Sequence, residues 1–454
     1  MVENQHYKHN KVTATVNIFW FRRDLRLEDN VGFSKALQGK SPVMPIFIFD
    51  TEILDKLSKD DARVSFIYNT LQDLNSTLQD HGSSLAIYYG KPLEVFKKLT
   101  AQFNVQNVIT NRDYEPYGQE RDLEIKEYLT TLTQHQDNAA AIGFYHYKDQ
   151  VIFEKDSIVK ADSTPYVVYT PYKNKWKSVF NPETDLKDHK TTIYFKNLYQ
   201  DTTLQNTTLE QMGFTTSSIK VPKHNTSATL IQNYEDTRNF PGVDGTSHLG
   251  PHLRFGTVSV RAMMRKAISQ TNEVFWSELI WREFFMQIFW HFPHTQQKAF
   301  RPKYDRIVWR NNEQEFEHWK NGTTGYVLVD AGMRELNKTG HMHNRVRMLV
   351  ASFLCKHLLI DWRWGETYFA SKLLDYEQSS NVGNWQWAAG SGVDAAPYFR
   401  IFNPITQADK FDKDKKYIKK WVPEYETQKY TAMIVDHKLA RERCLQTYKK
   451  GINE

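Results

Sequence analysis

The chain has 454 residues, a length that favours two domains over one compact core. A formal charge of +6 from 59 basic and 53 acidic residues excludes a generally basic nucleic-acid binder, so any such site should be a local patch. Two cysteines exclude a disulfide framework, and no apolar run reaches the roughly 18 residues of a membrane span. We therefore expect a cytoplasmic protein. Residues 1–14 are polar, lack the apolar core of a signal peptide and are expected to be a loose tail.

Short apolar runs alternate with helical patterns through residues 15–150. The expected strands are Val16–Phe21, Val43–Phe49, Leu85–Tyr89, Val105–Thr110 and, more weakly, Ala140–Tyr145. The expected helices are Val31–Leu37, Ala62–Asp80, Leu93–Phe103 and Gln119–Thr133. This alternation predicts an α/β domain built on a doubly wound parallel sheet. The first strand is followed by Arg22–Arg26 and not by GxGxxG, so a nicotinamide-type pyrophosphate cradle is not expected there.

Residues 151–229 are interpreted as a crossover linker between domains. From about Asn181 the segment is rich in Thr, Ser, Asn, Lys and Gln, with some helical character around Leu209–Met212. From Ala228 the pattern is helical almost to the end, which predicts a larger all-α domain over residues 230–454. Within it, Gly390–Ala395 matches GxGxxA but follows no βαβ unit, so we interpret it as a chance match.

A Thr246-Ser247 pair precedes an expected helix start in the second domain. Two hydroxyls and free backbone N–H groups at such an end bind phosphate well, although most pairs of this kind are plain N-caps.

Glu278, Trp281, Arg282 and Phe285 share one face of a helix expected within Glu273–Pro293. A carboxylate, an indole and a guanidinium on one face can hydrogen-bond a base edge and stack on its ring. The alternative is an intrahelical Glu278–Arg282 ion pair beside a core tryptophan.

The stretch Thr324–Pro404 combines arginine, histidine and amide side chains with several tryptophans. Because buried polar groups need partners, this density favours a binding site over an ordinary core. His341 and His343 suggest a metal, but no further Cys or His falls at ligand spacing, so no metal is expected. Arg347 and Asp375 are expected to form an ion pair, either beside a ligand or purely structural.

These residues resemble the photolyase/cryptochrome family, and most closely its microbial cyclobutane pyrimidine dimer DNA photolyases. The matching motifs occur in family order along nearly the whole chain: Trp20–Arg26, Thr170–Tyr172, Thr246-Ser247, Glu278–Phe284, Met342–Met348, Asp361–Arg363, Trp385–Trp387, Tyr398–Pro404 and Ile434–His437.

The resemblance implies a helical domain that binds FAD, with the reduced anionic flavin as the active form. The implied cofactor-binding residues are Tyr234, Thr246, Ser247, His248, Leu249, Gly250, Arg282, Asn344, Arg347, Asp375, Tyr376, Glu377 and Asn381. Among them, Asn381 would face the flavin N5 atom. The implied electron relay that photoreduces FAD comprises Trp309, Trp362 and Trp385.

The same resemblance implies light-dependent repair of UV-damaged DNA by a monomer. Photolyases are a known case of base flipping, in which the dimer leaves the stack at a cost of a few kcal/mol. The implied lesion-binding residues are Glu278, Trp281, Asn344, Arg345, Met348 and Trp387, and Glu278, Asn344, Met348 and Asn381 would be catalytic. A second antenna chromophore could lie near Asn111–Pro116; the sequence leaves open a folate, a deazaflavin, a flavin or none.

Four positions depart from the family pattern and bear on FAD affinity and redox tuning. His341 stands where Trp is usual, Gly250 where Ser is common, Glu377 where Asp is usual, and Asn384 where Gly is usual. The alternative functions are a cryptochrome-type photosensor and a (6-4) photolyase. Asn381 argues against plant-type sensors, which carry Asp there, and Met348 and Trp387 argue against (6-4) photolyases, which place His residues around the lesion.

Overall fold

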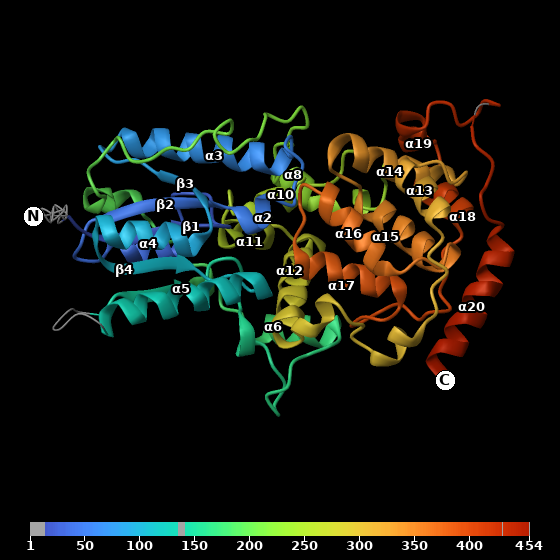
Figure 1. Cartoon of the computed structure of the whole chain (residues 1–454). Coiled ribbons are helices and arrows are strands. Elements are labelled where there is room, and N and C mark those ends of the chain that lie inside the picture. Colours follow the sequence, from blue (N-terminus) through green and yellow to red (C-terminus); the bar gives the residue numbers. More distant parts are fainter. Residues whose placement is uncertain (1–13, 135–140, 429, 454) are drawn as a thin grey trace, which may run out of the picture. The chain divides into compact units, whose positions relative to one another are not determined.

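The structure, a computed structural model, describes residues 14–134, 141–428 and 430–453 (Figure 1). The chain divides into two compact units. Unit 1 contains the described residues up to Gln150 together with Asp188–Ser217 and Phe255–Ser259. Unit 2 contains Val151–Lys187, Ser218–Arg254 and the described residues from Val260 onward. Apart from Ala14, the expected tail of residues 1–14 lies outside the described residues.

Unit 1 is built on a parallel sheet with the strand order β3-β2-β1-β4-β5. Its strands are β1 (Thr15–Phe21), β2 (Val43–Asp50), β3 (Ala86–Gly90), β4 (Asn104–Asn111) and β5 (Gly143–Tyr147). The order reverses at β1, as in a doubly wound sheet. The predicted α/β fold is confirmed. The third strand begins one residue later than expected, and the weak fifth strand begins at Gly143, its expected first residue, Ala140, lying outside the described residues.

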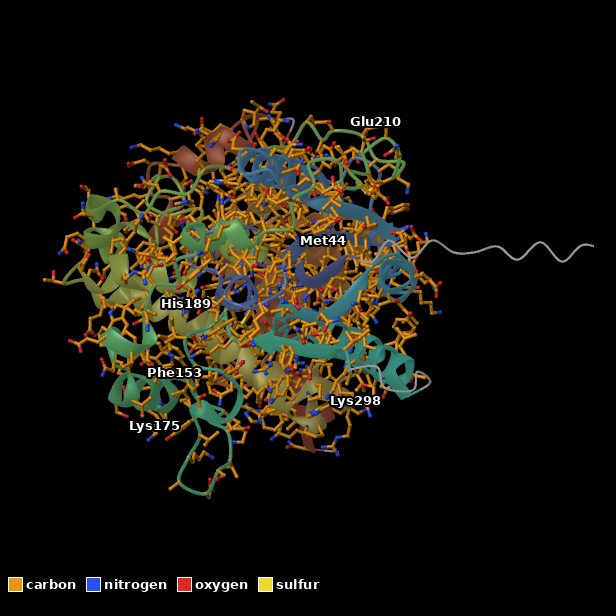
Figure 2. The ribbon with its side chains drawn as sticks, turned by 90° about the vertical axis from the view of Figure 1, so that its left-hand side faces the viewer. Met44, Phe153, Lys175, His189, Glu210 and Lys298 are labelled. Atoms are coloured by element: carbon orange, nitrogen blue, oxygen red, sulfur yellow. The ribbon has the colours of Figure 1, made fainter. Side chains whose placement is uncertain are left out.

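Helices cover both faces of this sheet because successive side chains of each strand point to opposite sides. On one face, Phe19 and Phe21 of β1 share an apolar cluster with α1 (Val31–Leu37) and α3 (Ala62–Gln79). On the other face, Ile18 and Trp20 pack with residues of α4 (Pro92–Gln102) and α5 (Pro116–Gln134), and α2 (Thr51–Leu54) follows β2. Met44 of β2 is fully buried among these side chains (Figure 2).

The Arg22–Arg26 loop after β1 is held by buried polar contacts within unit 1. Arg26 pairs with Asp149 at 2.7 Å, and the Asn111 amide donates to Asp24 at 2.6 Å. The Asn111 oxygen in turn accepts the backbone N–H of Gly32 at 2.9 Å. Buried charges and amides are costly unless they are paired, so these contacts explain the loop's charge density. Asn111, at the start of the expected antenna segment, is thus engaged in holding this loop.

Unit 2 is helical. Its helices are α6 (Tyr169–Val179), α7 (Pro182–Asp185), α8 (Ala228–Gln232), α9 (Tyr234–Thr237), α10 (Gly250–Phe255, which ends in unit 1), α11 (Val260–Ile268), α12 (Glu273–His291), α13 (Glu313–Asn321), α14 (Val327–Thr339), α15 (Asn344–Ser352), α16 (Trp362–Lys372), α17 (Gln378–Ala389), α18 (Pro404–Phe411), α19 (Lys416–Trp421) and α20 (His437–Asn453). Its main apolar core draws on α13 to α17, with Trp319, Trp362 and Trp385 almost fully buried. Within the described part of the chain, no helix is long and apolar enough to span a membrane.

The segment 151–229, interpreted as a linker, is distributed over both units. Residues Val151–Lys187 belong to unit 2 and contain α6, a helix that the sequence analysis did not predict. Tyr169, Tyr172 and Trp176 are its buried side chains, and their spacing of three and four residues could have revealed it. The helical character expected around Leu209–Met212 is wrong in detail, since these residues form a hydrogen-bonded turn.

A π-helical turn links two helices of the core. The α15 helix runs directly into π-helical Phe353–His357, all of whose residues are buried. Leu359 then adopts φ 50°, and the Asp361 side chain caps α16 by accepting the backbone N–H of Arg363. The chain thereby passes from Arg347 in α15 to Trp362 at the start of α16.

Candidate cofactor and substrate site

One cavity of about 220 Å³ lies in unit 2. The predicted cofactor-binding residues that line it are Gly250, Arg282, Asn344, Arg347, Asp375, Tyr376, Glu377 and Asn381. Met348 and Trp387, which were predicted to contact the lesion, line the same cavity, as does the relay residue Trp385. Residues predicted to bind the cofactor, to contact the lesion and to relay electrons therefore line the same cavity.

Other predicted residues lie outside the lining of this cavity. They are Tyr234, Thr246, Ser247, His248, Leu249, Glu278, Trp281, Arg345, Trp309 and Trp362. Of these, Leu249 directly precedes Gly250 in the chain, and Trp281 directly precedes Arg282. Arg345 donates to the Met348 sulfur at 3.9 Å and to the Asn239 side chain, so it contacts a lining residue.

Arg347 and Asp375 form the ion pair expected from the sequence. The guanidinium donates to both carboxylate oxygens, at 3.1 and 2.9 Å, while its Nε donates to the Met342 carbonyl at 2.7 Å. Burial alone would raise the pKa of the Asp375 carboxyl, but Arg347 outweighs it and the pKa lies below its ordinary value. The pair lines the cavity, which agrees with its interpretation as a pair beside a ligand.

The alternative of an intrahelical Glu278–Arg282 pair is wrong. Arg282 donates to Glu377 of the α17 start at 3.0 Å, and Glu278 pairs with Arg238. The Arg238 guanidinium also lies 5.3 Å from the centre of the Tyr234 ring. Glu278 and Arg282 of α12 therefore bind different partners. Of these two residues, only Arg282 lines the cavity.

Asn381 is oriented by Glu366, a residue that sequence reasoning missed. The Asn381 amide nitrogen donates to the Glu366 carbonyl and carboxylate at 3.1 and 3.0 Å. Tyr376 also donates to that carboxylate, at 3.4 Å, and burial raises the pKa of Glu366. With its nitrogen engaged, Asn381 presents its carbonyl oxygen as an acceptor. Nothing in the sequence distinguishes Glu366 from the other acidic residues of the segment.

His341 and His343 hold structural contacts within unit 2. His343 caps α15, its Nδ1 accepting the Arg345 N–H at 3.2 Å, and burial lowers the pKa of its imidazole to about 4. His341 lies 3.4 Å from Glu335, a carboxylate that also accepts the His343 N–H and the Tyr417 hydroxyl. Among the described residues no His, Cys, Asp and Glu cluster could hold a metal. The His341 imidazole is engaged with Glu335 outside the cavity lining.

Gly250 departs from the family pattern for a reason visible in unit 2. A Cβ atom at this position would lie 2.8 Å from an Asp375 carboxylate oxygen and 2.9 Å from its Cβ. The preceding loop reaches Gly250 through His248, which adopts φ 51°, and Ser247 accepts the Asn225 N–H at 2.9 Å. The absence of a side chain lets the start of α10 approach the Arg347–Asp375 pair closely.

The predicted tryptophans have different surroundings. Trp385 meets Trp319 edge-on with ring centres 6.1 Å apart, and its ring occupies the space a Cβ of Gly365 would need. Trp309 meets Tyr448 at 5.9 Å, and Trp362 lies beneath the Arg363 guanidinium at 4.7 Å. All three relay residues pack in or against one apolar core.

Two family models match the chain. The model described as DNA photolyase matches residues 17–190, and the FAD binding domain of DNA photolyase matches residues 275–428. Most of the cavity lining falls within the second range.

Individual relatives cover nearly the whole chain. The deoxyribodipyrimidine photo-lyase of Synechococcus sp. is 36% identical over 436 residues, which cover 90% of this chain and 87% of the relative. A bacterial class III photolyase from Agrobacterium tumefaciens superposes with a TM-score of 0.85 at 33% identity, covering 97% of this chain and 98% of that one. An archaeal photolyase from Sulfolobus tokodaii, solved with two FAD molecules, gives 0.80 at 33% identity, covering 96% and 100%. The chain belongs to the DNA photolyase family and carries that family's FAD-binding domain.

Proposed function

We propose that this protein uses light to split cyclobutane pyrimidine dimers in DNA, with reduced FAD as its cofactor. The observation that carries the proposal is the cavity of about 220 Å³ in unit 2. It brings together the Arg347–Asp375 pair, the oriented amide of Asn381 and the side chains predicted for the dimer. The names of the photo-lyase relatives support the same substrate.

The cavity residues fit FAD. The guanidinium groups of Arg282 and Arg347 supply positive charge for a diphosphate or a reduced flavin anion, and both are already held by carboxylates. The absent side chain of Gly250 keeps the start of α10 close to Asp375. Arg282, Arg347, Asp375 and Asn381 would thus hold and orient the cofactor. When bound, reduced FAD supplies the light-excited electron donor of the reaction.

Asn381 would tune the flavin through its carbonyl oxygen. Glu366 takes the hydrogens of its amide nitrogen, so the oxygen can accept a hydrogen bond from a flavin N–H. Such a bond favours a reduced ring that carries this hydrogen and disfavours the oxidised ring that lacks it. Glu366 acts on this step only by fixing the amide.

The lesion would be held by aromatic, amide and carboxylate groups. Trp387 and Met348 line the cavity beside Asn344, and Trp281 lies on the neighbouring α12 face. Stacking on an aromatic ring contributes about 1–3 kcal/mol per base, which offsets part of the cost of flipping. Glu278 would hydrogen-bond a pyrimidine edge, with Arg238 compensating its charge.

No side chain is needed as a nucleophile. Two carbon–carbon bonds of the cyclobutane ring break, and the electron given to the dimer returns to its donor, so there is no net oxidation or reduction. The residues of this chain exclude water, hold the dimer against the cofactor and stabilise transient negative charge. Trp385, Trp362 and Trp309 would serve only to reduce oxidised FAD beforehand.

A repair assay tests the proposal. Purified protein containing reduced FAD is illuminated with blue light in the presence of an oligonucleotide carrying one thymine dimer, and recovery of intact thymines is measured. Parallel reactions contain a (6-4) photoproduct or are kept in darkness. We expect repair of the dimer only, and only in light. Thymine dimers that remain unsplit after illumination of fully reduced enzyme would refute the proposed function. Repair of the (6-4) photoproduct would instead identify that lesion as the substrate.

A further inference from the structure

The unpredicted helix α6 places an aromatic ring flat against Trp281. The rings of Tyr169 and Trp281 lie with centres 3.5 Å apart and planes inclined by 10°, the closest to parallel of the contacts that Trp281 makes. Phe284 and Phe285 contact the same indole at 5.7 and 5.6 Å. Tyr169 is 6% exposed, so its ring has little freedom to move away. One face of the Trp281 indole is therefore covered by a fixed neighbour.

Hydrogen bonds fix α6 on α12. Glu283 of α12 accepts the Trp176 indole N–H at 2.6 Å and the backbone N–H groups of Ile152 and Phe153 at 2.7 and 2.8 Å. The Tyr169 hydroxyl donates to the Ser277 carbonyl at 2.7 Å. The carboxylate and the carbonyl both belong to α12 and lie on either side of Trp281 in sequence. Tyr169 is thus anchored to the same helix that carries the indole.

We propose that Tyr169 is a positioning residue that holds the Trp281 indole in the orientation needed to stack on a flipped pyrimidine dimer. The inference rests on the proposed function, because it assigns Trp281 to the lesion.

The physical argument concerns rotamer freedom. Without Tyr169 the Trp281 indole can adopt other rotamers. Binding of the dimer must then fix the indole in one orientation. Ordering one such side chain lowers an affinity by about twofold to about tenfold. Undamaged DNA makes no use of the indole, so its affinity stays unchanged. The ratio of the affinities for dimer-containing and undamaged DNA therefore reports on positioning, whereas general destabilisation of the fold would weaken both affinities.

The experiment is a double-mutant cycle on the FAD-loaded protein. The variants are Tyr169→Leu, Trp281→Ala and both together, and the affinity ratio is measured for oligonucleotides with and without a thymine dimer. Near-ultraviolet circular dichroism follows the stacked ring pair. Tyr169→Phe, which keeps the ring and loses only the hydroxyl, serves as the conservative variant. Ser178→Ala, at an exposed position of α6, serves as the matched control; Lys175 of the same helix is labelled in Figure 2.

We expect Tyr169→Leu to lower the affinity ratio by about twofold to tenfold in the wild-type background and to change nothing further in Trp281→Ala. Tyr169→Phe and Ser178→Ala should keep the wild-type ratio. An unchanged ratio in Tyr169→Leu, together with a large loss in Trp281→Ala, would overturn the positioning role alone. No preference of the wild-type protein for dimer-containing DNA would instead overturn the proposed function.

Discussion

Replacing Arg347 with methionine tests whether the Arg347–Asp375 pair holds unit 2 together around its cavity. Methionine keeps most of the length of the arginine side chain but has no hydrogen-bond donor for the Asp375 carboxylate. Asp375 accepts two hydrogen bonds from Arg347, at 3.1 and 2.9 Å. In Arg347→Met the carboxylate stays largely out of water and loses this partner.

The size of the effect follows from burial. The two side chains are 23% and 19% exposed, so water replaces little of the lost interaction. Removing one partner of a buried pair costs about 3–5 kcal/mol, and partial exposure places this one near about 3 kcal/mol. Arg347→Met combined with Asp375→Leu leaves no unpaired charge, so its stability should return to within about 1 kcal/mol of the wild type.

The assay is urea unfolding of the protein freed of FAD, followed by tryptophan fluorescence. All tryptophans except Trp20 lie in unit 2, so the signal reports on the unit that contains the pair. The matched control is Lys415→Met, because Lys415 pairs with Asp409 at 2.9 Å but that carboxylate is 66% exposed. The control should lose less than about 1 kcal/mol.

Two outcomes would refute this reasoning. A loss below about 1 kcal/mol in Arg347→Met, equal to that of the control, would mean that water satisfies Asp375. A double variant no more stable than Arg347→Met would mean that the lost stability comes from packing of the arginine stem and not from the unpaired carboxylate.

Three further changes test other parts of unit 2. The pKa of His343 is about 4 when folded and about 6.5 when unfolded, so the unfolded state binds more protons between these values and stability falls by about 3 kcal/mol as pH drops through that window. His343→Asn keeps the cap of α15 and should flatten this part of a stability-against-pH curve; an unchanged slope would contradict the assignment. Trp385→Phe should slow photoreduction of oxidised FAD, seen by its absorbance, yet spare repair by enzyme reduced chemically; loss of that repair would count against a pure relay role. Gly250→Ala should lower FAD occupancy after dialysis, because its Cβ would lie 2.8 Å from an Asp375 oxygen, and full occupancy would show that the carboxylate can move aside.

Local patterns in the sequence were sufficient to predict the sheet of unit 1 and part of the candidate site. The strands of unit 1 were predictable because each is a short apolar run, and α1 spans Val31–Leu37 as expected. The Arg347–Asp375 pair was also anticipated, although the assignment of cofactor and lesion roles came from family resemblance and stays a proposal.

Long-range pairing was not predictable in the same way. Helix spacing offers Arg282 as the partner of Glu278, but the true partner, Arg238, lies forty residues earlier. The role of Glu366 depends on two side chains meeting across α16 and α17, which no local pattern encodes. The α6 helix was missed because polar, lysine-rich residues surround its few buried aromatics. In the first two cases the deciding contact joins residues that are not neighbours in sequence, whereas α6 was missed because of its local composition.

The π-helical turn at Phe353–His357 has a consequence for insertions and deletions. A π turn accommodates one residue more than an α turn, and α-helical residues advance by about 100° each. Deleting one residue from this turn would let it close to regular α geometry, so the residues before and after it need not rotate relative to each other. A deletion within the regular α15 helix has no such outlet and would rotate the residues that follow by about 100°. We therefore expect the loss of one residue to be tolerated better in the π turn than in the helix that precedes it.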